Sequence, residues 1–281
     1  MSDWIAEHFG LFGAAYGTAL FMALLLPWLG VVLVLRQRLF TAAAVAQSAA
    51  LGFAVGMALG VGHVHEGHGG CGIELLALGA CGGVLAGMFA MQKARASSGG
   101  LESWAAVLFL FGGSASMLLL ADAPHGLQEV QRLQLSSLLG ASDTDLLVAF
   151  GLLCATLAMG AWRGRRMLLV ASDEAMAQVL GLRVHLYRAL CGVWIGVCLS
   201  FAIHVTGLLF AFSCTVLPVL VARQWARSLR MTLLLAPIVS VVTVAIALWI
   251  AHREEFDWPP GQAAVALQAV LAAVAMARRS R

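Results

Sequence analysis

Five side chains of metal-ligating types lie close together in one glycine-rich stretch, residues 62–73; they are His63, His65, Glu66, His68 and Cys71. Imidazoles separated by one and two residues on a flexible backbone can close around a borderline-soft ion such as zinc, and a carboxylate or thiolate can complete the shell. A solvated polar loop has the same composition, since Gly and His are ordinary loop residues. The stretch is therefore a candidate metal-capture or metal-sensing loop, with a hydrated loop as the alternative.

Two further residues could contact a solute that crosses a membrane. His204 stands between two apolar segments, where an ionisable residue is a functional candidate by default. Cys214, between Ser213 and Thr215, could offer a soft ligand to a passing ion in the middle of the next segment. The alternatives are that His204 only contacts interfacial water and that Cys214 only allows close helix packing.

The longest polar passage, residues 162–188, predicts a short helix outside the membrane. Ser172 or Asp173 can cap its start, with Glu174 in the first turn, and Gly181 can end it. Basic residues close to membrane spans stay on the inner side, so the arginines on both flanks of this passage place it in the cytoplasm. These arginines are Arg163, Arg165, Arg166, Arg183 and Arg188. An ordinary capped loop helix would show the same spacing.

The composition indicates that a membrane scaffold positions these candidates. Of the 281 residues, 61% are hydrophobic and 11% are charged, and the mean hydropathy is +0.91. A soluble domain of this length would carry about a quarter charged residues. We therefore predict an all-α integral membrane protein, a polytopic bundle of about eight or nine transmembrane helices. The predicted spans are residues 11–35, 39–61, 74–92, 104–121, 145–162, 189–203, 206–222, 231–251 and 261–277, and the pair around His204 could be one long bent helix.

The basic residues predict the orientation of this bundle. With the N-terminus outside, all of the 17 Lys and Arg residues except Arg132 and Arg253 lie in predicted cytoplasmic segments. We therefore expect an outside N-terminus, a cytoplasmic C-terminus and an odd number of spans. The net charge of +3 follows from this topology and indicates no nucleic-acid partner.

The predicted spans contain almost no charged residues, and this scarcity bears on the class of function. A proton-driven carrier needs buried Asp, Glu or His residues as a relay, and a membrane enzyme needs a nucleophile with its base or a cluster of carboxylates. The chain also has no GxxxxGK[ST] motif and no GxGxxG that opens a helix after a strand, so no nucleotide-binding motif is present. A pore whose energy comes from another protein fits best. An ATPase-independent channel and a polytopic membrane enzyme stay open as alternatives.

Three segments occur in an order that resembles one family of membrane permeases. They are residues 29–40 with the glycine-containing span after them, residues 168–184, and residues 206–223. The matching residues are Asp173, Glu174, Ala177 and Gly181 in the second segment, and Gly207, Pro218, Ala222 and Arg223 in the third. Over nearly its whole length the chain resembles the permeases of ABC transporters that import zinc, manganese or iron, the ABC-3 family.

The resemblance implies a single permease domain over residues 1–281, located in the inner membrane of a bacterium. It implies a homodimeric pore among membrane lipids, two cytoplasmic ABC ATPase subunits that hydrolyse ATP, and an extracytoplasmic metal-binding protein that delivers the ion. The chain would then be no enzyme and would carry no covalently bound cofactor. Its cargo would be Zn, Mn or Fe, with zinc favoured. Segment 163–188 would hold the coupling helix that docks on the ATPase, with Asp173, Glu174, Ala177 and Gly181 as the coupling residues.

The second span departs from the family pattern. There the family has a Gly-Asp pair and, four residues after the Asp, a His on the same helical face. The chain has Ala42, Ala43 and Gln47 at these positions. Gln47 can still offer a carbonyl oxygen to the translocation path, although an amide is a weaker zinc ligand than an imidazole. Either the ion passes with fewer ligands, or His204 and the outer histidines replace them, or the cargo is a metal chelate or another small solute.

Overall fold

The computed structural model describes residues 2–59, 73–92, 98–121, 141–251 and 259–279 of the chain. Every regular element in these ranges is an α-helix, which confirms the predicted all-α class. In chain order the helices are α1 (Ser2–Leu35), α2 (Leu39–Ala58), α3 (Ile73–Gln92), α4 (Ser98–Leu119), α6 (Asp143–Ser172), α7 (Glu174–Val179), α8 (Val184–Thr206), α9 (Leu208–Trp225), α10 (Leu229–Ala251) and α11 (Pro260–Arg279).

All helices of the described ranges except α7 are long, and they match the predicted spans one for one and in order. Seven of them are long and apolar enough to cross a membrane. The other two, α3 and α4, contain shorter apolar stretches, Leu76–Gln92 and Ser103–Leu119. The described residues therefore form a polytopic membrane bundle, as the composition predicts.

Helix α6 continues ten residues beyond the end of the predicted span, to Ser172. Arg163 and its two neighbouring arginines lie on this continuous helix and not in a loop. The extension is stabilised because its apolar face stays buried: Met167 and Val170 form one cluster with Tyr187 and Cys191 of α8. Within the predicted segment 163–188, only Glu174–Val179 is a separate short helix, and residues 184–188 already belong to α8.

The segments around His204 are two helices and not one bent helix. Helix α8 ends at Thr206 and α9 begins at Leu208, and Gly207 between them has a φ of 81°. Glycine adopts such a φ at little cost, whereas a side chain would disfavour it. His204 itself belongs to the last turn of α8, so the turn lies three residues later than predicted.

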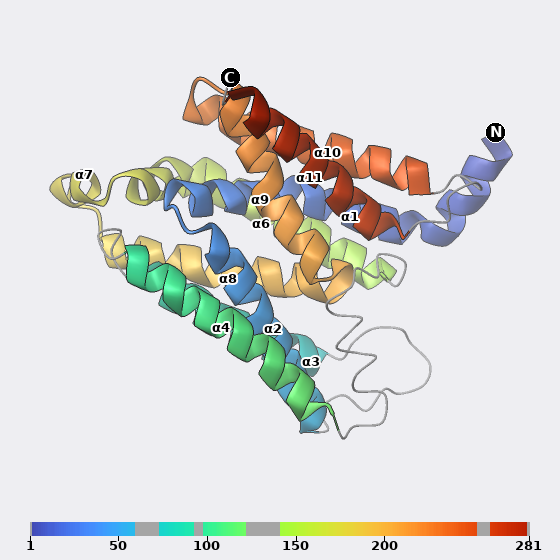
Figure 1. Cartoon of the computed structure of the whole chain (residues 1–281), viewed down its shortest axis with the longest axis horizontal. Helices are drawn as coiled ribbons and strands as arrows, with labels where there is room; N and C mark the ends of the chain where they lie inside the picture. Colours follow the sequence, from blue (N-terminus) through green and yellow to red (C-terminus); the bar gives the residue numbers. More distant parts are fainter. Residues whose placement is uncertain (1, 60–72, 93–97, 122–140, 252–258, 280–281) are drawn as a thin grey trace.

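The orientation of the bundle and the odd number of spans stay predictions. Figure 1 shows α7 at the left edge of the molecule, the C-terminus at the top and the N-terminus at the right. Which end faces the cytoplasm stays a prediction from the basic residues.

Helix α3 packs between α2 and α8 through contacts that only glycine allows. A Cβ atom on Gly192 of α8 would lie 2.6 Å from the carbonyl oxygen of Gly87, and one on Gly196 would lie 2.6 Å from that of Gly83. On the other face of α3, a Cβ atom on Gly82 would meet the carbonyl oxygen of Ser48 in α2. Small residues let membrane helices approach closely. The three helices are therefore in direct backbone contact.

Candidate functional site

The short helix α7 is capped at both ends by the residues that the sequence suggests. Asp173 is the N-cap, and its side chain accepts a hydrogen bond from the Met176 N–H at 3.0 Å. At the other end, Gly181 has a φ of 72° and donates its N–H to the Gln178 carbonyl at 2.9 Å. The Leu182 N–H donates to the Ala177 carbonyl at 3.0 Å, which completes a Schellman motif. Asp173, and not the alternative residue before it, starts the helix.

The two faces of α7 differ in burial. Ala177 is fully buried, in the cluster that Met167, Val170, Val184 and Tyr187 form with it. A larger side chain at this position would displace the helix from α6 and α8. The opposite face is exposed, so the helix lies on the surface of the bundle with one anchoring residue beneath it.

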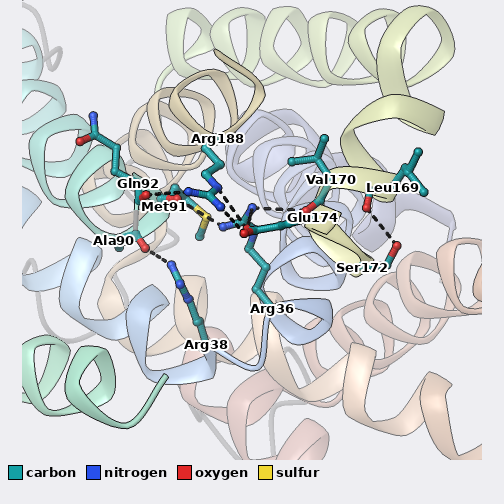
Figure 2. A network of polar contacts seen from close by, with 10 residues as sticks. All are labelled: Arg36, Arg38, Ala90, Met91, Gln92, Leu169, Val170, Ser172, Glu174 and Arg188. Carbon is teal, nitrogen blue, oxygen red and sulfur yellow. Dashed lines mark hydrogen bonds and ion pairs between the residues drawn. The ribbon is translucent and has the colours of Figure 1, made fainter. Parts of the chain in front are cut away.

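The Glu174 side chain turns inward, toward two arginines that are distant in the chain. Arg36 Nη2 lies 2.9 Å from Glu174 Oε1. Arg188 donates from Nε to the same oxygen at 3.1 Å, and its Nη2 contacts Oε2. Figure 2 shows both guanidinium groups converging on the carboxylate. Glu174 thus joins α7 to the end of α1 and the start of α8.

The same arginines also bind the C-terminal end of α3. Arg36 Nη1 donates to the Met91 carbonyl at 3.3 Å, and Arg188 Nη1 donates to the Gln92 carbonyl at 2.9 Å (Figure 2). Arg38 donates from Nη1 to the Ala90 carbonyl. The last carbonyls of a helix have no partner inside it and carry its negative dipole end, so guanidinium groups stabilise them. The arginines therefore satisfy three consecutive carbonyl groups of α3.

The turn between α1 and α2 explains how two of these arginines reach the same place. Gln37 has a φ of 56°, and the N–H of Arg38 donates to the Leu33 carbonyl at 3.0 Å. This left-handed residue closes α1 with a second Schellman motif and reverses the chain within three residues. The reversal leaves Gln37 exposed while Arg36 and Arg38 are buried.

Burial of so many positive charges has an electrostatic consequence. Arg36, Arg38 and Arg188 are each at most 5% exposed, and the Glu174 carboxylate contacts Arg36 and Arg188. Burial lowers the pKa of Arg36, and the Glu174 carboxylate opposes this shift. Burial, together with repulsion by Arg36, lowers the pKa of Arg38 to about 10. The Glu174 carboxylate, the last carbonyls of α3 and the Val170 carbonyl of α6, to which Arg36 Nη2 donates at 3.4 Å, stabilise these buried positive charges.

The three candidates for the translocation path have different surroundings. Gln47 is 6% exposed and faces Gly113 of α4. If Gly113 carried a Cβ atom, that atom would lie 3.5 Å from Cδ of Gln47. Its Oε1 is buried and has no hydrogen-bond partner among the described residues. The His204 ring stacks on Phe53, with centroids 5.5 Å apart. Cys214 is fully buried, and its Sγ accepts a hydrogen bond from Gln268 Nε2 of α11 at 3.4 Å.

A comparison with protein families matches residues 9–279 to the ABC 3 transport family. The chain belongs to this family. The match runs through every described helix from α1 to α11, including α7 and the two arginine-bearing ends of α1 and α8. The chain is therefore a multi-pass membrane component of the ABC 3 transport family, as the order of its segments suggests.

Two solved structures have a similar fold. PsaBC from Streptococcus pneumoniae in complex with Fab has a TM-score of 0.79 and 17% sequence identity, covering 98% of this chain and 95% of that chain. A metal-chelate type ABC transporter in an inward-facing conformation has a TM-score of 0.73 and 17% identity, covering 98% of this chain and 89% of that chain. No protein of curated function matches the sequence.

The proposed metal loop of this ABC 3 family chain lies outside the described residues. His63, His65, Glu66, His68 and Cys71 all belong to residues 60–72, so their arrangement as ligands stays a prediction. Within the ranges that the structure describes, no group of three or more His, Cys, Asp or Glu side chains could hold a metal ion.

Sequence reasoning about this ABC 3 family chain missed the role of three arginines. Arg36, Arg38 and Arg188 count in the sequence only as markers of the cytoplasmic side, where solvated side chains are expected. Arg36 is 138 residues away from Glu174, so no local spacing connects them. Glu174 is one of the residues that match the spacing of the family, which marked it as important. The resemblance did not indicate which residues contact it.

Proposed function

We propose that this chain is the permease subunit of an ATP-binding-cassette importer of divalent metal ions in a bacterial inner membrane. Two copies would form the pore, separate cytoplasmic ATPase subunits would hydrolyse ATP, and an extracytoplasmic binding protein would deliver the ion. Membership of the ABC 3 transport family supports this proposal. The structural observation that carries it is the outer face of α7.

The outer face of α7 is apolar although it lies outside the predicted spans. Val179 is 82% exposed and Leu180 is 58% exposed. A groove beside them is lined by Gln178, Leu182, Arg183, Val184, His185 and Leu186. Exposed apolar patches on a surface away from lipid mark interaction sites for other proteins. A rigid, capped helix with such a face is suited to insert into a recess of a cytoplasmic ATPase, and Asp173, Ala177 and Gly181 hold it in shape.

The proposed mechanism is alternating access. Closure of the ATPase subunits on ATP would move α7, and the dimeric bundle would open outward to receive the solute. Gln47, with its unpartnered buried Oε1, is the leading candidate for contact with the solute, because an unsatisfied buried acceptor is destabilising unless something binds it. His204 and Cys214 are further candidates along the path.

A metal chelate or another small solute is the second candidate cargo, with a specific observation in its favour. Ala43 and Gln47 are both buried and neutral. A chelated metal brings its own ligands and needs fewer from the permease, whereas a bare ion favours carboxylate and imidazole ligands. Zinc, manganese and iron ions, and their chelates, must therefore be compared directly.

The deciding experiment is uptake into vesicles that contain this chain with its cognate ATPase and binding protein. Zinc, manganese, iron and a ferric chelate are offered separately, with and without ATP. We expect ATP-dependent uptake of one metal ion. Uptake of the chelate alone would select the second cargo, and uptake without any ATPase subunit would contradict the importer and favour a channel.

A substitution on α7 tests the docking face. Val179→Asp should abolish co-purification of the ATPase, because a carboxylate would enter an apolar contact. Val179→Thr, which keeps the shape of the side chain, is the matched control and should retain the ATPase. Equal retention by both variants would show that this face does not dock the ATPase.

A further inference from the structure

Two guanidinium groups each connect the Glu174 side chain of α7 to a backbone carbonyl of α3. Arg188 contacts Glu174 with Nε and Nη2 and the Gln92 carbonyl with Nη1. Arg36 contacts Glu174 with Nη2 and the Met91 carbonyl with Nη1. We name these two residues the arginine bridge. Because a guanidinium group is planar and rigid, a displacement of the Glu174 carboxylate must either move the carbonyls of α3 or break hydrogen bonds.

Breaking those hydrogen bonds is unfavourable in this environment. Both members of the arginine bridge are buried, and a buried charge that loses its partner is strongly destabilising. Glu174 is the described carboxylate that both of them contact. Movement of α3 together with α7 is therefore the less costly response.

Helix α3 can pass such a movement on to the pore region. Its backbone is in direct contact with α8 through Gly192 and Gly196, so the two helices cannot move closer. On the opposite face, Gly82 contacts the carbonyl of Ser48, the residue that follows Gln47 in α2. Close-packed interfaces shift as units because they are not continuously deformable. A displacement of α3 would therefore change the position of Gln47.

We propose that Arg36 and Arg188 are positioning residues that transmit the movement of α7 to α3, and through α3 to the solute-contacting region of α2. The proposal rests on the proposed function, since it requires an ATPase that moves α7. In this proposal α3 transmits the movement, although α3 and α7 are not adjacent in the chain. Covalent continuity alone would instead assign it to α6 and α8.

The test measures backbone amide hydrogen exchange in the complex of this chain with its cognate ATPase, in lipid nanodiscs, with ADP or with a non-hydrolysable ATP analogue. In the unaltered complex we expect the analogue to change exchange in α7 and also in the last turn of α3. Amide exchange reports local opening of each helix separately. A nucleotide response in α7 without any response in α3 would overturn the relay.

Arg188→Lys is the main variant, because it keeps the charge but replaces the rigid fork with a single ammonium. The response of α3 to nucleotide should be lost while that of α7 persists, and the amount of solute transported per ATP hydrolysed should fall about tenfold, within the range typical of coupling between sites. Arg36→Lys tests the second arm in the same way and serves where Arg188→Lys does not fold. Arg165→Lys, at an exposed position of α6, is the matched control and should change neither readout.

The outcomes separate the relay from the proposed function. Absence of ATP-driven uptake and of any nucleotide response in α7 of the unaltered complex would contradict the importer itself. Uptake with an α3 response that survives both lysine variants would leave the importer standing and overturn the arginine bridge as its relay. A loss confined to α3 in both lysine variants, with the transport ratio lowered, is the result that supports it.

Discussion

Glu174 and Arg188 form a two-point ion pair beneath α7, although 14 residues separate them in the chain. The pair is nearly enclosed, with side-chain exposures of 14% for Glu174 and 5% for Arg188. Glu174 also binds Arg36, so one carboxylate is shared by two guanidinium groups. Buried ion pairs contribute little net stability against an apolar core, but loss of one partner is strongly destabilising. The stability of this region should therefore depend more on Glu174 than on either arginine.

The first prediction compares the loss of stability on substitution of Glu174 with the loss on substitution of Arg188. Glu174→Gln leaves two buried guanidinium groups without a carboxylate and should lower the free energy of unfolding by about 3–5 kcal/mol. Arg188→Met leaves Glu174 paired with Arg36 and should have a smaller effect. Denaturant titration in detergent micelles gives both values, and Arg165→Met, at an exposed position, should stay within about 0.5 kcal/mol of the unaltered chain.

A double variant completes this test. Glu174→Gln combined with Arg188→Met removes both partners of the pair, so its effect should be smaller than the sum of the two single effects by about 0.5–3 kcal/mol. Additive effects, or a larger effect of Arg188→Met than of Glu174→Gln, would show that the carboxylate is not the centre of the group.

The second prediction compares two glycines that have open space around them. A Cβ atom on Gly181 or on Gly164 would meet nothing within 4 Å, but Gly181 has a φ of 72° whereas Gly164 lies inside α6. Gly181→Ala should lower the free energy of unfolding by about 1 kcal/mol, because an alanine disfavours the left-handed conformation. Gly164→Ala should raise it by about 0.5–1 kcal/mol, because alanine favours the helix. Thermal unfolding with the same detergent measures both, and changes of equal sign would contradict the role of Gly181 as the C-terminal stop of α7.

The third prediction concerns the contact between α3 and α8. Gly192→Ala would place a Cβ atom 2.6 Å from the Gly87 carbonyl oxygen, a backbone atom that cannot turn aside. The helices must then separate, and we expect a loss of about 1–3 kcal/mol. Gly151→Ala in α6 has nothing within 4 Å of the added atom and is the matched control. If Gly192→Ala unfolds at the temperature of the control, the close approach of α3 and α8 is not needed for the fold.

The fourth prediction separates folding from transport at Gln47. Gln47→Leu removes a buried, unpartnered Oε1, so the free energy of unfolding should stay the same or rise. ATP-driven uptake should fall about tenfold, which corresponds to the loss of one contact worth about 1.4 kcal/mol. Both quantities are measured on the same preparation, the first by denaturant titration and the second in vesicles.

Gln268→Leu is the control for this variant. Its Oε1 is buried without a partner among the described residues, as in Gln47, but its Nε2 donates to Thr243 Oγ1 at 3.2 Å and to Cys214 Sγ at 3.4 Å. The substitution therefore also removes two hydrogen bonds and should lower stability by about 1 kcal/mol relative to Gln47→Leu. If Gln47→Leu destabilises the chain as much as Gln268→Leu and leaves uptake unchanged, the Gln47 amide has a structural role only.

The sequence alone determined the features that depend on local chemistry. The apolar spans follow from composition, because a helix that crosses lipid must be apolar over about 20 residues. The stop of α7 at Gly181 follows from the conformational freedom of glycine, and the structure confirms it. At the other end the sequence left Ser172 and Asp173 open as caps, and the structure selects Asp173. The break between α8 and α9 was only partly predicted, since the segment boundary was visible but Gly207 was not recognised as the turn.

Only the tertiary structure decided which distant residues meet. Arg36, Glu174 and Arg188 come from three separate places in the chain, and hydropathy treats their charges only as markers of one side of the membrane. Gly83 and Gly87 likewise look like ordinary small residues of a membrane helix until α8 lies against them. The physical reason is that spans are set by the transfer of local segments into lipid, whereas pairing of charges and close backbone contacts depend on which helices become neighbours.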